Sequence, residues 1–181
     1  MAAGDLTTLA TLEQWLGLAS GNADEALLGR LITAASGFIE NWCGRKFVSQ
    51  AYTETRDGPG GSRLIFAHSP VTVVASVVVD DIAIPAGTPG YHFTDLMIDL
   101  SGYRFTAGRQ NVALSYTAGY AVIPAELEQA CIELCAFRYR ELDRIGISSK
   151  GMAGESTSFV IKDVPDSVIA ALVPYRKVIS V

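Results

Sequence analysis

Apolar side chains follow a helical spacing near the start of the chain. Between residues 24 and 43 they recur at i, i+3, i+4 and i+7, which is typical of an amphipathic helix. Gly44 follows the last of them, and glycine commonly ends helices because it adopts the left-handed conformation without a steric cost. A shorter helix is predicted before this one, with Thr11 and Gln14 forming a capping box and Gly17 ending it.

The period of the pattern changes to two between residues 48 and 116. Residues 71–79 are rich in valine and predict a buried, bulged strand, and Asp80 and Asp81 predict a tight reversal after it. Short strands are also expected at residues 52–56, 63–66, 82–84, 91–93, 97–100, 103–105 and 112–116. This spacing predicts a small antiparallel sheet unit inserted between helices.

Helical spacing returns after this unit. Pro124 suits the first position of a helix that runs to about residue 144, and Gly146 ends it. Residues 147–158 are rich in glycine and serine without periodicity, which predicts a mobile loop. A short final helix is expected over residues 165–173, stopped by Pro174.

These patterns predict an α+β fold, a small helical bundle with an inserted antiparallel β unit. Residues 1–181 are expected to form a single domain. Residues 1–47 and 117–181 form its helical part, and residues 48–116 form the β unit.

Composition adds that the chain is unusually apolar. Charged residues make up 18% of it, against about 25% in an average soluble domain, and the mean hydropathy is +0.28. The longest apolar stretch, residues 71–79, is far shorter than the ~20 residues of a membrane-spanning helix, and no secretory signal is visible at the N-terminus. We therefore expect the apolar excess to form a large core or to face a partner protein.

The net charge of −5 argues against a basic nucleic-acid-binding surface, because binding phosphate requires clustered cations. Candidate chemistry is equally sparse. His68 and His92 lack the spacing of metal ligands, and the glycine-rich stretch at residues 58–61 lacks the Lys-Ser/Thr of a phosphate-binding loop. Cys131 and Cys135 lie one helical turn apart and are expected to be buried free thiols. No catalytic residue, metal or cofactor is predicted.

Three stretches resemble the head–tail connector (adaptor, or head-completion) proteins of long-tailed bacteriophages and prophages. Residues 24–45 have the family's acidic start, small-residue middle and aromatic end before Gly44 and Arg45. Residues 112–130 are similar to its strand, Ala-Gly-Tyr corner and proline-started helix, and residues 164–176 to its closing helix. The resemblance extends from about residue 6 to residue 177, but the β unit is larger than in the compact, nearly all-helical members.

The resemblance implies a structural virion protein rather than an enzyme. Family members form a ring, typically dodecameric, beneath the portal protein, where they extend the DNA channel and bind the next neck or tail protein. DNA passes without sequence-specific binding and no membrane is involved. The ring would be assembled in the host bacterial cytoplasm and located in the neck of the virion. Two alternatives remain open: another ring-forming tail component, such as a tail terminator or minor tail protein, or a small ligand-binding module or enzyme.

Three segments are the candidate contact regions. A portal-docking tail is expected to comprise Tyr175, Arg176, Lys177, Val178, Ile179 and Val181, with packing on its own domain as the alternative. An inter-subunit ion-pair band is expected to comprise Arg138, Arg140, Glu141 and Arg144, with a solvated helix face as the alternative. A loop that becomes ordered on assembly is expected to include Gly146, Lys150, Gly151, Gly154 and Glu155, with a plain surface loop as the alternative.

Overall fold

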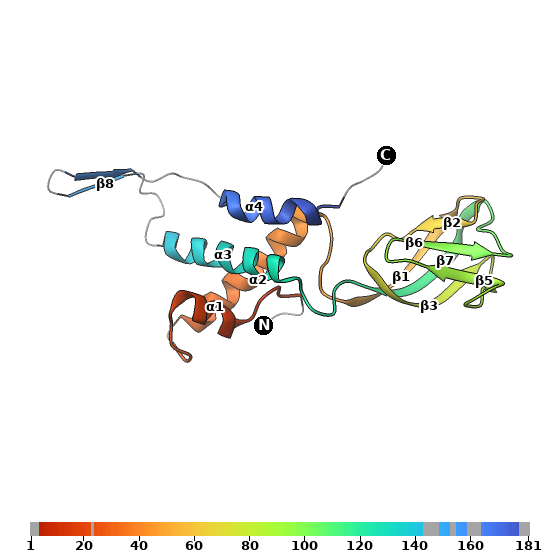
Figure 1. Ribbon diagram of the computed structural model, residues 1–181, viewed down its shortest axis with the longest axis horizontal. Coiled ribbons are helices and arrows are strands. Elements are labelled where there is room, and N and C mark those ends of the chain that lie inside the picture. Colours follow the sequence, from red (N-terminus) through yellow and green to blue (C-terminus); the bar gives the residue numbers. More distant parts are fainter. Residues whose placement is uncertain (1–3, 23, 143–148, 153–154, 159–163, 178–181) are drawn as a thin grey trace. The chain divides into compact units, whose positions relative to one another are not determined.

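The computed structural model describes residues 4–22, 24–142, 149–152, 155–158 and 164–177. The chain divides into two compact units, which Figure 1 shows as ribbons. One unit is helical and consists of Met1–Arg45 with Ile123–Val181, and the other is a β unit of Lys46–Val122. The two larger antiparallel sheets lie in the β unit and the four helices in the helical unit, which confirms the predicted α+β class.

The helical unit contains α1 (Leu9–Leu16), α2 (Glu25–Cys43), α3 (Ala125–Glu141) and α4 (Asp166–Leu172), and a 3₁₀ turn, η2 (Val173–Tyr175), follows α4. The last two helices run antiparallel: the Ser167 hydroxyl at the start of α4 donates to Glu133, whereas the Tyr175 hydroxyl beyond its end donates to Glu126. All four helices direct apolar side chains into the interior. Those at most 1% exposed include Leu12, Leu28, Ile32, Ile39, Leu127, Cys131, Leu134, Cys135, Val168 and Leu172.

The predicted end of α2 is confirmed, because Gly44 caps it with a left-handed φ of 68°. The predicted start of α1 is wrong. Thr8, not Thr11, is the N-cap, and its side-chain oxygen accepts a hydrogen bond from the Thr11 backbone N–H over 3.1 Å. Both threonines suit a cap by residue type. The earlier one is used because Leu6 is buried and its N–H donates to the Ser36 hydroxyl oxygen, which fixes where the chain enters the helix.

The β unit consists of two antiparallel sheets. The four-stranded sheet has the order β1 (Gln50–Gly58), β7 (Gly108–Ala118), β3 (Val71–Val79) and β4 (Ile82–Ala83). The three-stranded sheet has the order β2 (Arg63–Ile65), β6 (Met97–Ser101) and β5 (Gly90–Phe93). Both sheets contribute to one apolar core, in which the rings of Phe66 and Tyr116 have centroids 4.7 Å apart. Because the inner faces share this core, the two outer faces point to opposite sides of the β unit.

Strand β3 is bulged, as its sequence predicts, and the bulges alter its burial pattern. Its pairing with β7 shifts between Val71 and Val73 and again between Val74 and Ser76. Each bulge adds a residue to one strand, so burial recurs at every third position, at Val71, Val74 and Val77. The predicted reversal after this strand is also confirmed: Asp80 and Asp81 have φ values of 50° and 65°, as a tight hairpin turn requires.

Two local predictions are wrong. Residues 103–105 form no strand; Phe105 is fully buried, and its N–H donates to the Gly61 carbonyl at 2.8 Å. Its aromatic side chain enters the core without strand pairing. Part of the predicted loop at residues 147–158 is an antiparallel pair, β8 (Ser149–Met152) with β9 (Glu155–Ser158). These residues are mostly small or polar and lack the alternation of apolar and polar side chains, so the sequence pattern gives no sign of a strand.

Candidate assembly surfaces

The predicted tail begins with residues that contact the helical unit. The Tyr175 hydroxyl donates to Glu126 Oε2 on α3 at 3.0 Å, and the Lys177 backbone N–H donates to the Cys43 carbonyl at the end of α2 at 2.8 Å. Both bonds join this segment to helices more than 45 positions away in the sequence. The start of the tail is therefore held on α2 and α3.

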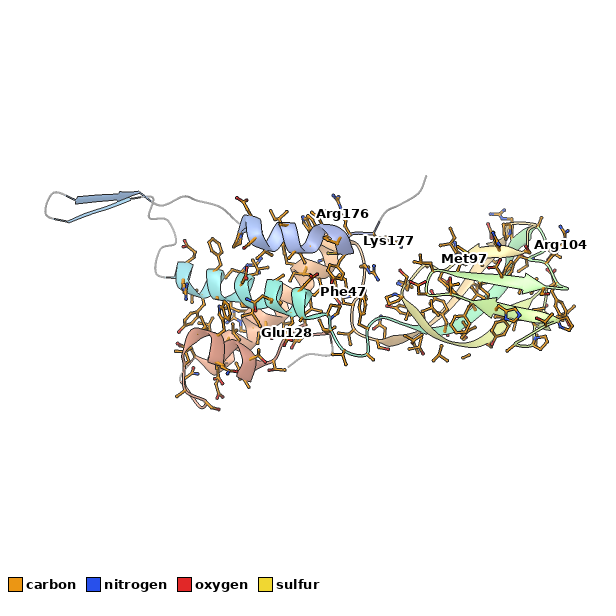
Figure 2. All side chains as sticks on the ribbon, viewed as in Figure 1. Phe47, Met97, Arg104, Glu128, Arg176 and Lys177 are labelled. Atoms are coloured by element: carbon orange, nitrogen blue, oxygen red, sulfur yellow. The ribbon has the colours of Figure 1, made fainter. Side chains whose placement is uncertain are left out.

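Arg176 adds a third contact, with its guanidinium 5.4 Å from the centroid of the Trp42 ring. Figure 2 shows Arg176 and Lys177 at the end of α4. Burial raises the pKa of the nearby Cys43 thiol to about 11, although Arg45 and Arg176 lower it by their positive charges. The remaining members of the predicted tail, Val178, Ile179 and Val181, lie outside the described residues.

The charged end of α3 is held partly within the chain. The guanidinium of Arg138 lies 5.3 Å from the centroid of the Phe38 ring on α2, and the Tyr139 hydroxyl donates to Asp24 Oδ2 at 2.6 Å. Of the predicted ion-pair band, Arg140 is exposed, Glu141 is half-buried and Arg144 lies outside the described residues. The structure thus places Arg138 against its own α2 and leaves Arg140 on the surface.

The predicted assembly loop is partly described. Lys150 and Gly151 belong to β8 and Glu155 to β9, whereas Gly146 and Gly154 lie outside the described residues. The β8–β9 pair is a two-stranded sheet separate from both sheets of the β unit. An isolated pair of strands is at best marginally stable in water.

Sequence reasoning missed an uncharged surface on the outer side of the four-stranded sheet. Nine outward positions lie in three rows across β1, β7 and β3, with no charged residue among them. We call these the neutral face: Ala51, Thr117 and Val73; Thr53, Ser115 and Ser76; Thr55, Ala113 and Val78. The Thr53 and Ser115 hydroxyl oxygens at its centre are 3.3 Å apart. The alternation of residues 112–118 shows that the outward residues of this strand are uncharged. The pairing register with β1 and β3 was needed to show that uncharged residues of all three strands lie side by side.

A second apolar surface lies on the final helix. Ile169, Ala170, Val173 and Pro174 are all exposed, and they follow one another at helical spacing on the side of α4 and η2 that faces away from buried Val168 and Leu172. The sequence pattern predicted the helix but assigned no role to this side of it.

Nothing in the described residues resembles a reaction centre. They contain no group of three or more His, Cys, Asp or Glu side chains that could hold a metal ion. A shallow hollow of about 440 Å³ lies between β3 and β5, lined by residues that include Val73, Tyr91 and Phe93. Among the residues that line this hollow, no nucleophile is paired with a general base. No described helix is long and apolar enough to cross a membrane.

A cluster of hydrogen-bonded polar side chains lies at a turn of the β unit. Asp80 accepts hydrogen bonds from the Thr106 hydroxyl and from the Asn111 side-chain amide, the latter over 2.9 Å. These two bonds, Thr106 first, hold the pKa of Asp80 below its usual value. Asn111 also accepts a bond from the Gly58 N–H at 2.9 Å. The cluster joins the turn after β3, the segment before β7, β7 itself and the end of β1, so its role is structural.

The buried thiols form a second internal cluster. Cys131 and Cys135 are fully buried on α3, and Cys131 lies 3.6 Å from the Ser36 hydroxyl. A hydrogen bond to Cys131 and then burial raise the pKa of Cys135. The prediction of buried free thiols is confirmed for these two residues and extends to Cys43.

The comparisons with solved structures find proteins of virion necks. One chain, from the neck of an empty GTA (gene transfer agent) particle computed with C6 symmetry, is 22% identical with a TM-score of 0.65 and matches over 100% of this chain and 95% of its own length. Another, from the neck of a native GTA particle computed with C12 symmetry, is 21% identical with a TM-score of 0.62, and the match again covers 100% of this chain and 95% of the other. A chain of the native gene transfer agent virion is 20% identical with a TM-score of 0.64, over 100% of this chain and 94% of its own.

A search of curated proteins finds no match. The sequence model of one family, described as head completion protein, matches residues 5–178. This range includes both the helical unit and the β unit, and it contains all three stretches that carried the resemblance. The chain therefore belongs to the head completion protein family, and its role is that of a structural head–tail connector of the virion.

Proposed function

We propose that the chain forms a ring, dodecameric in the virion, beneath the portal protein, where it extends the DNA channel and binds the next neck or tail protein. The observation that carries this proposal is the likeness of the whole chain to proteins from necks computed with sixfold and twelvefold symmetry. The low charge content agrees with it, because permanent interfaces are more apolar than ordinary surface. In this ring the helical unit and the β unit act together as one connector domain.

The tail is the proposed contact with the portal protein. Tyr175 and Lys177 hold its start against the helical unit, so the tail is attached at a fixed point. A short segment attached at a fixed point loses less conformational entropy on binding than a free one. Arg140, which is exposed at the end of α3, is proposed to pair with an acidic group of a neighbouring subunit, with Glu141 and Arg144 in the same band. The β8–β9 pair is proposed to be stabilised by a neighbour on assembly.

Passing DNA is proposed to make no specific contact with the ring. The net charge of −5 disfavours binding of phosphate, so DNA can move through the channel without being retained. No enzymatic step is assigned to the chain.

Electron microscopy of particles made with and without the chain tests this function. With it, DNA-filled heads should carry an additional ring below the portal and bind tails; without it, heads should lack this ring and remain tailless. A ring at the far end of the neck or in the tail would favour a tail terminator or minor tail protein instead. Heads with a normal neck in the absence of the chain would contradict the proposal.

A further inference from the structure

The neutral face has a composition unlike that of a sheet surface in contact with water. Antiparallel sheets with one solvated face normally place polar and charged residues outward. On β1 the arrangement is reversed, because Glu54 and Arg56 lie in register with the buried residues Leu114 and Val112, on the inner side. The outward residues Ala51, Thr53 and Thr55 are uncharged, and the first charge on this side of the strand is Asp57, next to its end.

Absence of charge is also a property of interface cores. Charged residues are depleted at the centre of protein–protein interfaces, whereas interfaces with nucleic acid need cations. The neutral face contains no lysine or arginine. Val73, at one corner of it, has 55% of its surface exposed and provides apolar area. These features favour a protein partner over the DNA backbone.

The opposite side of the β unit carries a second surface without net charge. The outer side of the three-stranded sheet, here called the three-stranded face, consists of Arg63, Ile65, Met97, Asp99 and His92. Ile65 has 60% of its surface exposed and lies in register with Met97, which makes an apolar row. The charges of the next row compensate one another, because Arg63 Nε and Asp99 Oδ1 are 2.5 Å apart.

The two faces therefore point in opposite directions, differ in structure and both carry no net charge. A subunit of a closed ring meets its two neighbours through two different surfaces, so that one surface of each copy contacts the other surface of the next. A protein of the ring above or below would contact only one surface of the β unit, so it would not account for two such faces on opposite sides.

We infer that the β units of neighbouring copies stack around the ring, with the neutral face of one copy against the three-stranded face of the next. The inference rests on the proposed ring and specifies which surfaces neighbouring subunits of that ring use to contact one another. The occupant of each face is a second copy of this chain. Thr53 and Ile65, one from each face, come together at every subunit boundary.

The first test uses a charge at the centre of the neutral face. Thr53→Arg would bury an unpaired charge at the boundary, so we expect about tenfold or greater loss of copies bound to tailless heads that lack this protein. The matched control is Thr33→Arg, the same change at an exposed position of α2, which should bind as the wild type does. Circular dichroism and thermal unfolding of the free variants verify that both fold.

The second test is chemical cross-linking with a bifunctional maleimide. The three native cysteines are buried and should not react in the folded chain. A variant with both Thr53→Cys and Ile65→Cys, assembled on the heads, should give a ladder from dimers to closed rings. Each single variant should give no ladder, because its partner thiol is absent.

The outcomes separate the inference from the proposed function. If the wild type forms no ring on heads, the proposed function fails. If the wild type forms rings but Thr53→Arg forms them equally well and the double variant gives no ladder, stacking is overturned while the ring stands. Dimers from Thr53→Cys alone would show like faces in contact and would also overturn it. A Thr53→Arg ring that assembles but does not bind the next neck protein would assign the neutral face to that protein instead.

Discussion

The guanidinium of Arg176 lies over the indole ring of Trp42, 5.4 Å from its centroid, and joins the last described residues of the chain to the end of α2. The next residue, Lys177, donates its backbone N–H to the carbonyl of Cys43, the residue after Trp42. Two adjacent residues thus bind two adjacent residues of a distant helix. This contact fixes the position of the last described residues on the helical unit.

Loss of the cation–π contact should destabilise the helical unit slightly. We expect Arg176→Ala to lower the free energy of unfolding by about 0.5–1 kcal/mol, the usual size of an exposed cation–π interaction. Urea unfolding followed by tryptophan fluorescence measures this, since both tryptophans of the chain lie in the helical unit. Arg140→Ala removes an exposed arginine from α3 and serves as the control. Equal stability of the two variants would show that the Trp42 contact contributes nothing.

Removal of the last four residues should separate docking from folding. Without residues 178–181 the chain keeps the bonds of Tyr175 and Lys177, so its thermal unfolding temperature should stay close to that of the wild type. Binding to heads in a pull-down should be lost, because the segment proposed to enter the portal protein is absent. Full recovery of heads by the shortened chain would rule out the tail as the docking segment.

Gly119 should not tolerate a side chain. Its φ is 112°, and a Cβ atom there would lie 2.6 Å from the Val48 carbonyl oxygen. Gly119→Ala should therefore destabilise the β unit by about 2 kcal/mol or more. In α2, Gly37 has nothing within 4 Å of the corresponding position, so Gly37→Ala should raise stability by about 0.5–1 kcal/mol. Calorimetry of both variants provides the comparison, and a neutral Gly119→Ala would contradict the assigned geometry.

The Asp80 cluster should make the β unit sensitive to acid. Hydrogen bonds from Thr106 and Asn111 hold the pKa of Asp80 below its ordinary value of 3.8, so the fold favours the ionised carboxylate. The resulting stabilisation is present above pH 3.8 and is lost as the pH falls through the lowered pKa. Asp80→Asn should therefore be less stable than the wild type at neutral pH, with the difference shrinking in strong acid.

Urea unfolding followed by circular dichroism at several pH values tests this dependence. Asp81→Asn, the same change at the next position of the same turn, is the control because Asp81 makes neither of these two bonds. Asparagine also tolerates the positive φ of both positions, so backbone strain does not confuse the comparison. A difference between Asp80→Asn and the wild type that persists unchanged in acid would contradict the proposed cause.

Much of the fold followed from local rules. The period of apolar residues predicted α2, and Gly44 marked its end, because a helix must bury one side and glycine adopts the left-handed conformation after it. The valine-rich strand β3 and the turn at Asp80 were predicted for similar local reasons. The wrong predictions concern Thr11, residues 103–105 and β8–β9, where packing of Leu6, burial of Phe105 and backbone pairing decided the outcome.

The candidate surfaces, like the fold, were predicted only in part from the sequence. By itself, the sequence determined that the chain is unusually apolar and low in charged residues. It contains no catalytic or metal-binding motif. Its order of helix, β unit, Gly119 corner and proline-started helix resembles that of the connector family. Only the tertiary structure decided where the uncharged residues gather. The neutral face exists because the register of β1, β7 and β3 aligns small residues that lie up to 66 positions apart, such as Ala51 and Thr117. Register depends on pairing between distant strands, which the local pattern of side chains does not contain.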